Sequence, residues 1–184
     1  VACTEKGVTE HSFTLDRPEE PVPGVLWLPE GAEGPRPLVL LCHGGTQEKR
    51  APNIVALGRR LVRHLGHAAV AIDCPHHGER MPEEERGMSR EERREAMRGR
   101  LFGEGRRATV SQAMGDWTET LDAVADRPDV GAGPVGWWGL SMGCAFGVPF
   151  VSREPRVNAA VLGLAGWDES SPRSGFDEAA RRIT

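Results

Sequence analysis

The sequence lacks a hydrophobic run long enough to cross a membrane. A membrane-spanning helix needs about 20 apolar residues in succession, and the apolar runs of this chain, such as Val135–Leu140, are far shorter. The first residues, Val1–Thr4, lack the apolar core of a secretion signal. They also begin without a methionine, so we expect a trimmed amino end. We therefore predict no membrane association.

The chain also lacks an excess of positive charge. Its formal net charge is −4 at pH 7, which argues against a nucleic-acid-binding protein. Arginine outnumbers lysine by 21 to 2, a bias typical of a GC-rich genome more than of a phosphate-binding site.

Cysteine is sparse, and its spacing excludes the usual motifs. The four cysteines, Cys3, Cys42, Cys74 and Cys144, form no CxxC pair of the kind that binds zinc or does redox work. Cys42 and Cys74 lie in apolar runs, where reduced thiols of the core are expected. Reduced thiols favour a cytoplasmic protein.

The remaining pattern alternates between strands and helices. The 184 residues suffice for one domain, residues 1–184, with a substantial core. Apolar residues recur at helical spacing over 53–65 and 110–126, whereas 38–42, 68–74 and 135–140 read as buried strands. Two further strands are expected within 9–28, and another at 157–166. This order predicts an α/β fold with a mostly parallel sheet and helices on both faces.

Residues 82–108 differ from the rest because they are densely charged, with both signs mixed. Glutamate and arginine three or four residues apart support an exposed helix. We predict a helical excursion here that could cap a site. Its few apolar side chains, Met97, Leu101 and Phe102 among them, could roof a pocket for a modest acyl group.

The segment Gly139-Leu140-Ser141-Met142-Gly143 places a serine between a predicted strand and a predicted helix. A nucleophilic serine of the GxSxG type needs this strand-turn-helix context. Side chains at positions 139 and 143 would collide in so tight a turn, and the Met142 N–H at the helix start could donate to an oxyanion. The alternative is a serine that merely caps the helix.

Two other turns follow buried strands. In His43-Gly44-Gly45-Thr46, the Gly45 N–H could be a second donor to an oxyanion, or the turn could simply end a strand. The adjacent His76 and His77, near Asp73, invite a metal site. Neighbouring histidine side chains diverge and no further ligand is evident, so we favour a structural loop at a pocket rim and predict no metal.

With these motifs, the chain resembles the α/β-hydrolase superfamily, and within it the dienelactone-hydrolase-like, small serine esterase type. The resemblance rests on "LLCHGGT", "AIDCPHHGER" and "GLSMG" and covers the chain from about residue 22. It implies a serine hydrolase that cleaves a carboxylic ester or related acyl bond of a small molecule, without a cofactor. Ser141 then matches the nucleophile, Gly45 and Met142 match the oxyanion donors, and His43 is structural.

The resemblance also implies a catalytic acid and histidine after Ser141, and here the sequence departs from it. No histidine follows Ser141, and Asp168 is the one acid that could stand in for the usual one. We expect the acid and histidine beyond Thr184 in a longer polypeptide, or on a second chain, for instance in a homodimer. The alternative is a non-catalytic relative that binds a small ligand.

Overall fold

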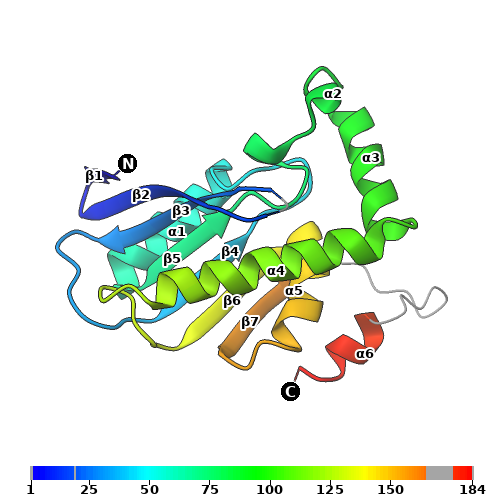
Figure 1. Ribbon diagram of the computed structural model, residues 1–184. Coiled ribbons are helices and arrows are strands. Elements are labelled where there is room, and N and C mark those ends of the chain that lie inside the picture. The colour runs from blue at the N-terminus through cyan, green and yellow to red at the C-terminus, as the bar shows by residue number, and fades with distance from the viewer. Residues whose placement is uncertain (1, 19, 165–175, 184) are drawn as a thin grey trace.

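A mixed β-sheet forms the centre of the computed structural model, which describes residues 2–18, 20–164 and 176–183 (Figure 1). Within these residues the sheet has seven strands in the order β1-β2-β3-β5-β4-β6-β7. The strands are β1 (Ala2–Glu5), β2 (Val8–Leu15), β3 (Val22–Pro29), β4 (Leu38–Cys42), β5 (Ala68–Ile72), β6 (Val135–Leu140) and β7 (Val157–Gly163).

The direction of the strands confirms the predicted mostly parallel sheet. The pairs β4–β5, β4–β6 and β6–β7 are parallel, and the pairs among β1, β2, β3 and β5 are antiparallel. Because β2 and β5 both run opposite to β3, all strands except β1 and β3 point the same way. No sequence pattern predicted β1, a short edge strand whose four residues are all exposed.

Helices cover both faces of the sheet, as predicted. On one face, Ile54 and Val62 of α1 pack with Trp27 of β3, and on the other, α4 and α5 pack over β6. Trp27 fits against α1 because position 58 is glycine, where a Cβ would lie 2.8 Å from the indole. The helices are α1 (Pro52–Leu65), the 3-10 turn η1 (Gly78–Arg80), α2 (Glu83–Arg86), α3 (Arg90–Phe102), α4 (Arg106–Ala125), α5 (Met142–Val151) and α6 (Phe176–Ala180).

Aromatic side chains hold α4, β6 and α5 together. The rings of Trp117 and Trp137 meet edge to face with centroids 5.0 Å apart, and Phe150 lies 5.1 Å from Trp137. Such pairs add a directional attraction to the burial of their large apolar surface. The start of α5, where Ser141 lies, is thereby fixed relative to the sheet.

The charged segment 82–108 folds as predicted into a helical excursion. It consists of α2, α3 and the first turn of α4, and Figure 1 shows α2 and α3 rising beyond one end of the sheet. Ser89 and Glu92 form a reciprocal capping box at the start of α3. An ion pair from Arg100 to the buried Glu85 joins α3 to α2. In the described part of the chain, no helix is both long and apolar enough to cross a membrane.

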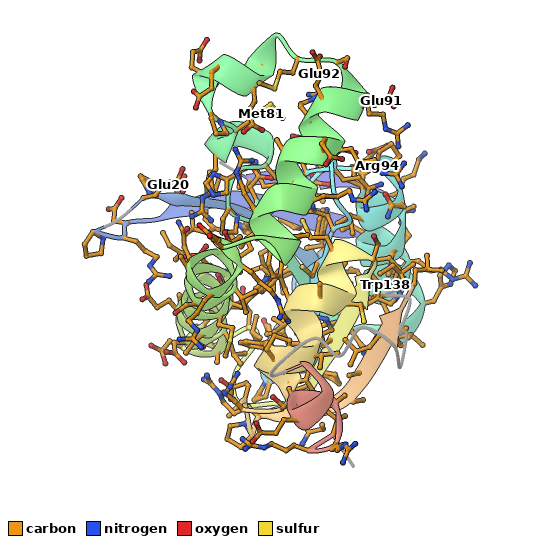
Figure 2. The ribbon with its side chains drawn as sticks, turned by 90° about the vertical axis from the view of Figure 1, so that its right-hand side faces the viewer. Glu20, Met81, Glu91, Glu92, Arg94 and Trp138 are labelled. Carbon is orange, nitrogen blue, oxygen red and sulfur yellow. The ribbon has the colours of Figure 1, made fainter. Side chains whose placement is uncertain are left out.

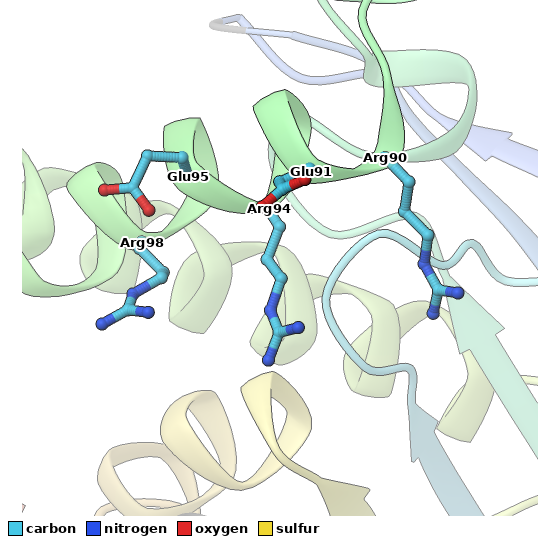
Figure 3. A pocket seen from close by; sticks show the side chains of 5 residues that line it. All are labelled: Arg90, Glu91, Arg94, Glu95 and Arg98. Carbon is cyan, nitrogen blue, oxygen red and sulfur yellow. The ribbon is translucent and has the colours of Figure 1, made fainter.

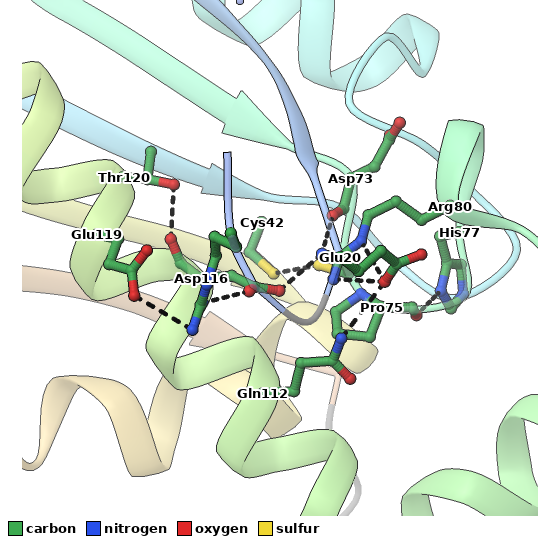
Figure 4. Close-up of polar contacts among 12 residues, drawn as sticks. Glu20, Cys42, Asp73, Pro75, His77, Arg80, Gln112, Asp116, Glu119 and Thr120 are labelled. Carbon is green, nitrogen blue, oxygen red and sulfur yellow. Dashed lines mark hydrogen bonds and ion pairs between the residues drawn. The ribbon is translucent and has the colours of Figure 1, made fainter. Parts of the chain in front are cut away.

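A buried ionic network ties the loop after β5 to α4 (Figure 4). Asp116 accepts from Arg17 at 2.6 Å and from Arg80 at 2.6 Å, and Arg80 also donates to Glu20 and to the Asp73 carbonyl oxygen. Burial raises the pKa of Asp116, although both guanidinium groups oppose this. The network therefore depends on complete pairing of its charges.

We predict that Asp116→Ala lowers the free energy of unfolding by about 3–5 kcal/mol, because it leaves two arginines without their buried partner. Urea unfolding measures this loss. The matched control is Asp122→Ala on the same helix, whose ion pair with Arg156 is largely exposed and is worth about 1 kcal/mol or less. Equal losses in the two variants would contradict the assigned role of the network.

Candidate active site

Ser141 lies at the sharp turn between β6 and α5, in a strained backbone conformation. Its φ of 56° and ψ of −113° are unfavourable for a residue with a side chain. Hydrogen bonds hold the turn on both sides: the Ser141 N–H donates to the Gly163 carbonyl at 2.8 Å, and the Ser141 carbonyl accepts from Cys144 and Ala145 at 3.0 Å. The strain is thus maintained by β7 and by the first turn of α5.

The Ser141 side chain does not cap the helix. It makes no capping hydrogen bond to α5, and the residue is exposed. The alternative of a capping serine is therefore wrong. What the turn does instead is present a hydroxyl at the carboxyl end of the parallel strand β6, the place where open α/β sheets bind ligands.

The two flanking glycines are required by sterics, as predicted. A Cβ at Gly139 would overlap the carbonyl oxygen of Gly143, and a Cβ at Gly143 would overlap that of Cys42. The second contact crosses from α5 to the end of β4. The turn can be this tight only because both side chains are absent.

We predict that Gly139→Ala destabilises the protein by about 1–3 kcal/mol, the usual cost of forcing extra atoms into a packed site. The control is Gly136→Ala on the same strand, where the nearest atom to a Cβ would be 3.8 Å away. Thermal unfolding compares the two variants. An unchanged stability in Gly139→Ala would show that the turn can relax.

The turn after β4 lies beside the Ser141 turn. Cys42 pairs with Gly139 in the sheet, and a Cβ on Gly44 would be 3.8 Å from the Leu140 carbonyl oxygen. The Gly44 N–H donates to the Gln47 side chain at 3.0 Å. Among the described residues, no hydrogen bond engages the Gly45 N–H.

The Met142 N–H is a second backbone N–H group that is available to donate a hydrogen bond. It belongs to the first turn of α5, whose N–H groups have no partner within the helix. The positive end of the helix dipole also lies there. The Met142 N–H thus directly follows Ser141 at the start of α5, and the Gly45 N–H belongs to the turn after β4 that lies beside this one.

His43 is a structural residue. It is fully buried, its Nε2 accepts from the Cys74 N–H at 3.1 Å, and its Nδ1 therefore donates to the Gly44 carbonyl at 2.8 Å. Both ring nitrogens are occupied by backbone groups, so His43 is not free to accept a proton from Ser141. Cys42 and Cys74 lie beneath it as free, buried thiols, as predicted.

The carboxylate of Asp73 holds the loop after β5 in place through hydrogen bonds. Asp73 is fully buried and accepts from the Lys49 ammonium at 2.6 Å and from the backbone N–H groups of Lys49 and Glu79. Both Asp73 oxygens are therefore used within the protein. In the described residues, no three His, Cys, Asp or Glu side chains gather as metal ligands.

His77 is buried and remains neutral at physiological pH. Its Nδ1 lies 2.8 Å from the Pro75 carbonyl oxygen, and its ring centroid is 5.3 Å from that of His43. Burial, with the nearby His43 as a smaller cause, lowers the pKa of His77 from 6.5 to about 4. Between these two pH values the unfolded chain binds a proton here that the folded protein does not bind.

We therefore predict that acidification weakens the fold through His77. Stability falls as the pH drops from 6.5 toward 4, by about 2 kcal/mol between pH 7 and pH 5 for this group. Urea unfolding at both pH values should show the slope in the wild type and its reduction in His77→Gln. The exposed His64→Gln is the control, and a wild-type slope retained in His77→Gln would refute the assignment.

The excursion covers the turn after β4. A Cβ on Gly45 would overlap the sulfur atom of Met97 on α3, so the two residues are in direct contact. Beneath Met97 is a cavity of about 10 Å³, the room of roughly one water molecule. Its lining comes from the loop after β5, α3, α4 and α5: Pro75, His76, His77, Met97, Arg100, Leu101, Thr109, Met142 and Phe146.

A wider, open groove lies on another face of α3. Figure 3 shows the side chains of Arg90, Arg94 and Arg98 extending from one side of the helix, with Glu91 and Glu95 beside them. Figure 2 places Arg94 on the same side of the molecule as Trp138 of β6. Because the charges are mixed and exposed, this surface is typical of a solvated helix face.

Of the predicted site residues, Ser141 and Met142 lie together at the start of α5, and Gly45 lies in the neighbouring turn after β4. Asp168 lies outside the described residues, as does the side chain of Phe102. Sequence reasoning missed the contact of Met97 with Gly45 and the capture of the Gly44 N–H by Gln47. The first contact has no local signal, because Met97 and Gly45 come together only through folding, whereas Gly44 and Gln47 are three residues apart within one turn.

Solved structures resemble the chain over most or all of its length. A cold-adapted esterase from an Arctic intertidal metagenomic library, solved with bound PEG, is 35% identical, with a TM-score of 0.75 over 100% of this chain and 71% of that chain. Dienelactone hydrolase from Anabaena variabilis is 22% identical, with a TM-score of 0.58 over 85% and 64% of the two chains.

A dienelactone-hydrolase-like promiscuous phosphotriesterase from metagenomic libraries is 23% identical, with a TM-score of 0.66 over 85% of this chain and 60% of that one. No protein-family model and no curated protein sequence matches the chain. The relationship to known proteins therefore rests on the likeness to solved structures.

Proposed function

The chain belongs to the α/β-hydrolase superfamily, with esterases and dienelactone-hydrolase-like proteins among its relatives, and we propose that it is a serine hydrolase that cleaves carboxylic esters of small molecules. The observation that carries the proposal is the strained Ser141 turn, which presents an uncapped hydroxyl at the end of β6. Proteins retain such strain mainly where it serves a function.

In the proposed reaction, the Ser141 Oγ attacks the ester carbonyl. The Gly45 and Met142 N–H groups stabilise the oxyanion of the tetrahedral intermediate, a contribution that typically amounts to about 3–4 kcal/mol for a single donor. The alcohol leaves, an acyl-enzyme remains on Ser141, and water releases the acid. The mechanism requires no metal and no organic cofactor.

The Ser141 hydroxyl needs a general base to become a good nucleophile. His43 does not fit this role, because backbone groups occupy both of its ring nitrogens. We assign the base and its acid partner to residues outside the described part of the protein. The esterase relative is longer than this chain, which spans 71% of it.

We predict that a fluorophosphonate probe labels Ser141 of the wild-type protein, because a positioned and activated serine reacts with the electrophilic phosphorus. Mass spectrometry of the labelled peptide locates the adduct. Ser141→Ala should abolish the labelling. The matched control is Ser152→Ala at the other end of α5, whose hydroxyl donates to the Pro149 carbonyl at 3.0 Å and whose loss should leave labelling unchanged.

Equal labelling of Ser141→Ala and wild type would exclude Ser141 as the nucleophile. A wild-type protein that folds but never labels would instead support the alternative of a non-catalytic relative that binds a small ligand. Hydrolysis of p-nitrophenyl acetate, lost in Ser141→Ala, then tests the ester specificity itself.

A further inference from the structure

The small cavity beneath α3 directly adjoins the proposed oxyanion donors. Met142, which carries one donor N–H, contributes its buried side chain to the cavity lining. Met97 lines the same cavity and also contacts Gly45, which carries the other donor. A carbonyl held by the two N–H groups would therefore have this cavity beside it.

The two sides of such a carbonyl differ in the space that they offer. Ser141 is exposed, so a leaving alcohol can extend toward solvent. The cavity, in contrast, is bordered by side chains of four elements and has a volume of only about 10 Å³. It has room for little more than the methyl group of an acetyl ester.

Met97 is the side chain that keeps this space small. It is only partly buried, it lies on the excursion and not on the sheet, and its thioether reaches the Gly45 backbone. The other apolar side chains of the lining are more deeply fixed: Leu101, Met142 and Phe146 are each at most 5% exposed. Unbranched methionine fills irregular gaps, and such positions tolerate substitution.

We propose that Met97 determines acyl-chain length, and that it restricts the enzyme to esters of very short acids such as acetate. This inference rests on the proposed function, because it concerns the acyl group that Ser141 receives. The position of Met97 is set by α3, whose Arg100 pairs with the buried Glu85 of α2. The excursion thus acts as a fixed wall of the acyl site.

The test compares p-nitrophenyl acetate with p-nitrophenyl hexanoate. In the wild type kcat/KM should favour acetate, and in Met97→Ala the ratio of hexanoate to acetate should rise at least tenfold, since each methylene that a pocket accepts or excludes changes kcat/KM by about tenfold or more. Met88→Ala removes the same side chain from the same excursion outside the cavity, and it should retain the wild-type ratio.

An unchanged ratio in Met97→Ala would overturn the proposal. So would an equal increase for both esters, which would make Met97 part of a lid that slows all substrates. If Met97→Ala is unstable, Met97→Val provides a smaller truncation, for which the same ratio should rise by a lesser factor. Circular dichroism establishes that each variant is folded.

A second measurement is independent of catalysis, so the inference can fail separately from the proposed function. 2-Hexanone, a non-hydrolysable ketone with a four-carbon chain, is titrated while the ¹³C-methyl signal of Met142 is followed by NMR. A saturable shift in Met97→Ala that is absent in the wild type supports the role of Met97 as a wall of the acyl site, even if no ester is cleaved. Identical titrations of the two proteins would overturn it.

Discussion

The backbone strain at Ser141 is the constraint on which the rest of the site depends. A residue with a side chain holds φ at 56° only because neighbouring elements prevent relaxation. β7 accepts its N–H, the first turn of α5 donates to its carbonyl, and Gly143 packs directly on the end of β4. The same contacts bring the turn after β4 alongside, so the strained turn and the proposed oxyanion donors form one unit.

Buried charged side chains hold the loop after β5 in place beside this unit. Asp73 and Asp116, both buried, fix the loop after β5, and their cationic partners come from the N-terminal segment, from the loop before α1 and from η1. This loop carries His77 and one wall of the small cavity. Buried ion pairs contribute little net stability but are costly to break. These pairs therefore fix the position of the loop that forms this wall of the cavity.

The excursion, residues 82–108, places a side chain against the turn after β4. The sheet and its covering helices are shared with hydrolases of several kinds, and a fold alone does not determine the substrate. Here α3 places Met97 against Gly45, so a segment remote from Ser141 in sequence borders the space beside it. Specificity within a shared fold commonly depends on such added segments over a fixed sheet.

The sequence by itself determined the strands, the main helices and the Ser141 turn, because each depends on local sterics or on a repeating apolar pattern. Gly139 and Gly143 mark a turn in which a Cβ has no space, and Ile54 and Val62 repeat at helical spacing. β1 escaped notice since a short, exposed edge strand has no apolar pattern. Tertiary structure alone decided that Met97 covers Gly45, that backbone groups occupy both nitrogens of His43, and that Arg17 and Arg80 share Asp116. The contacts of Met97 with Gly45, of His43 with the Cys74 N–H and of both arginines with Asp116 join residues far apart in the chain, and their distances are set by how the loops and helices pack on the sheet.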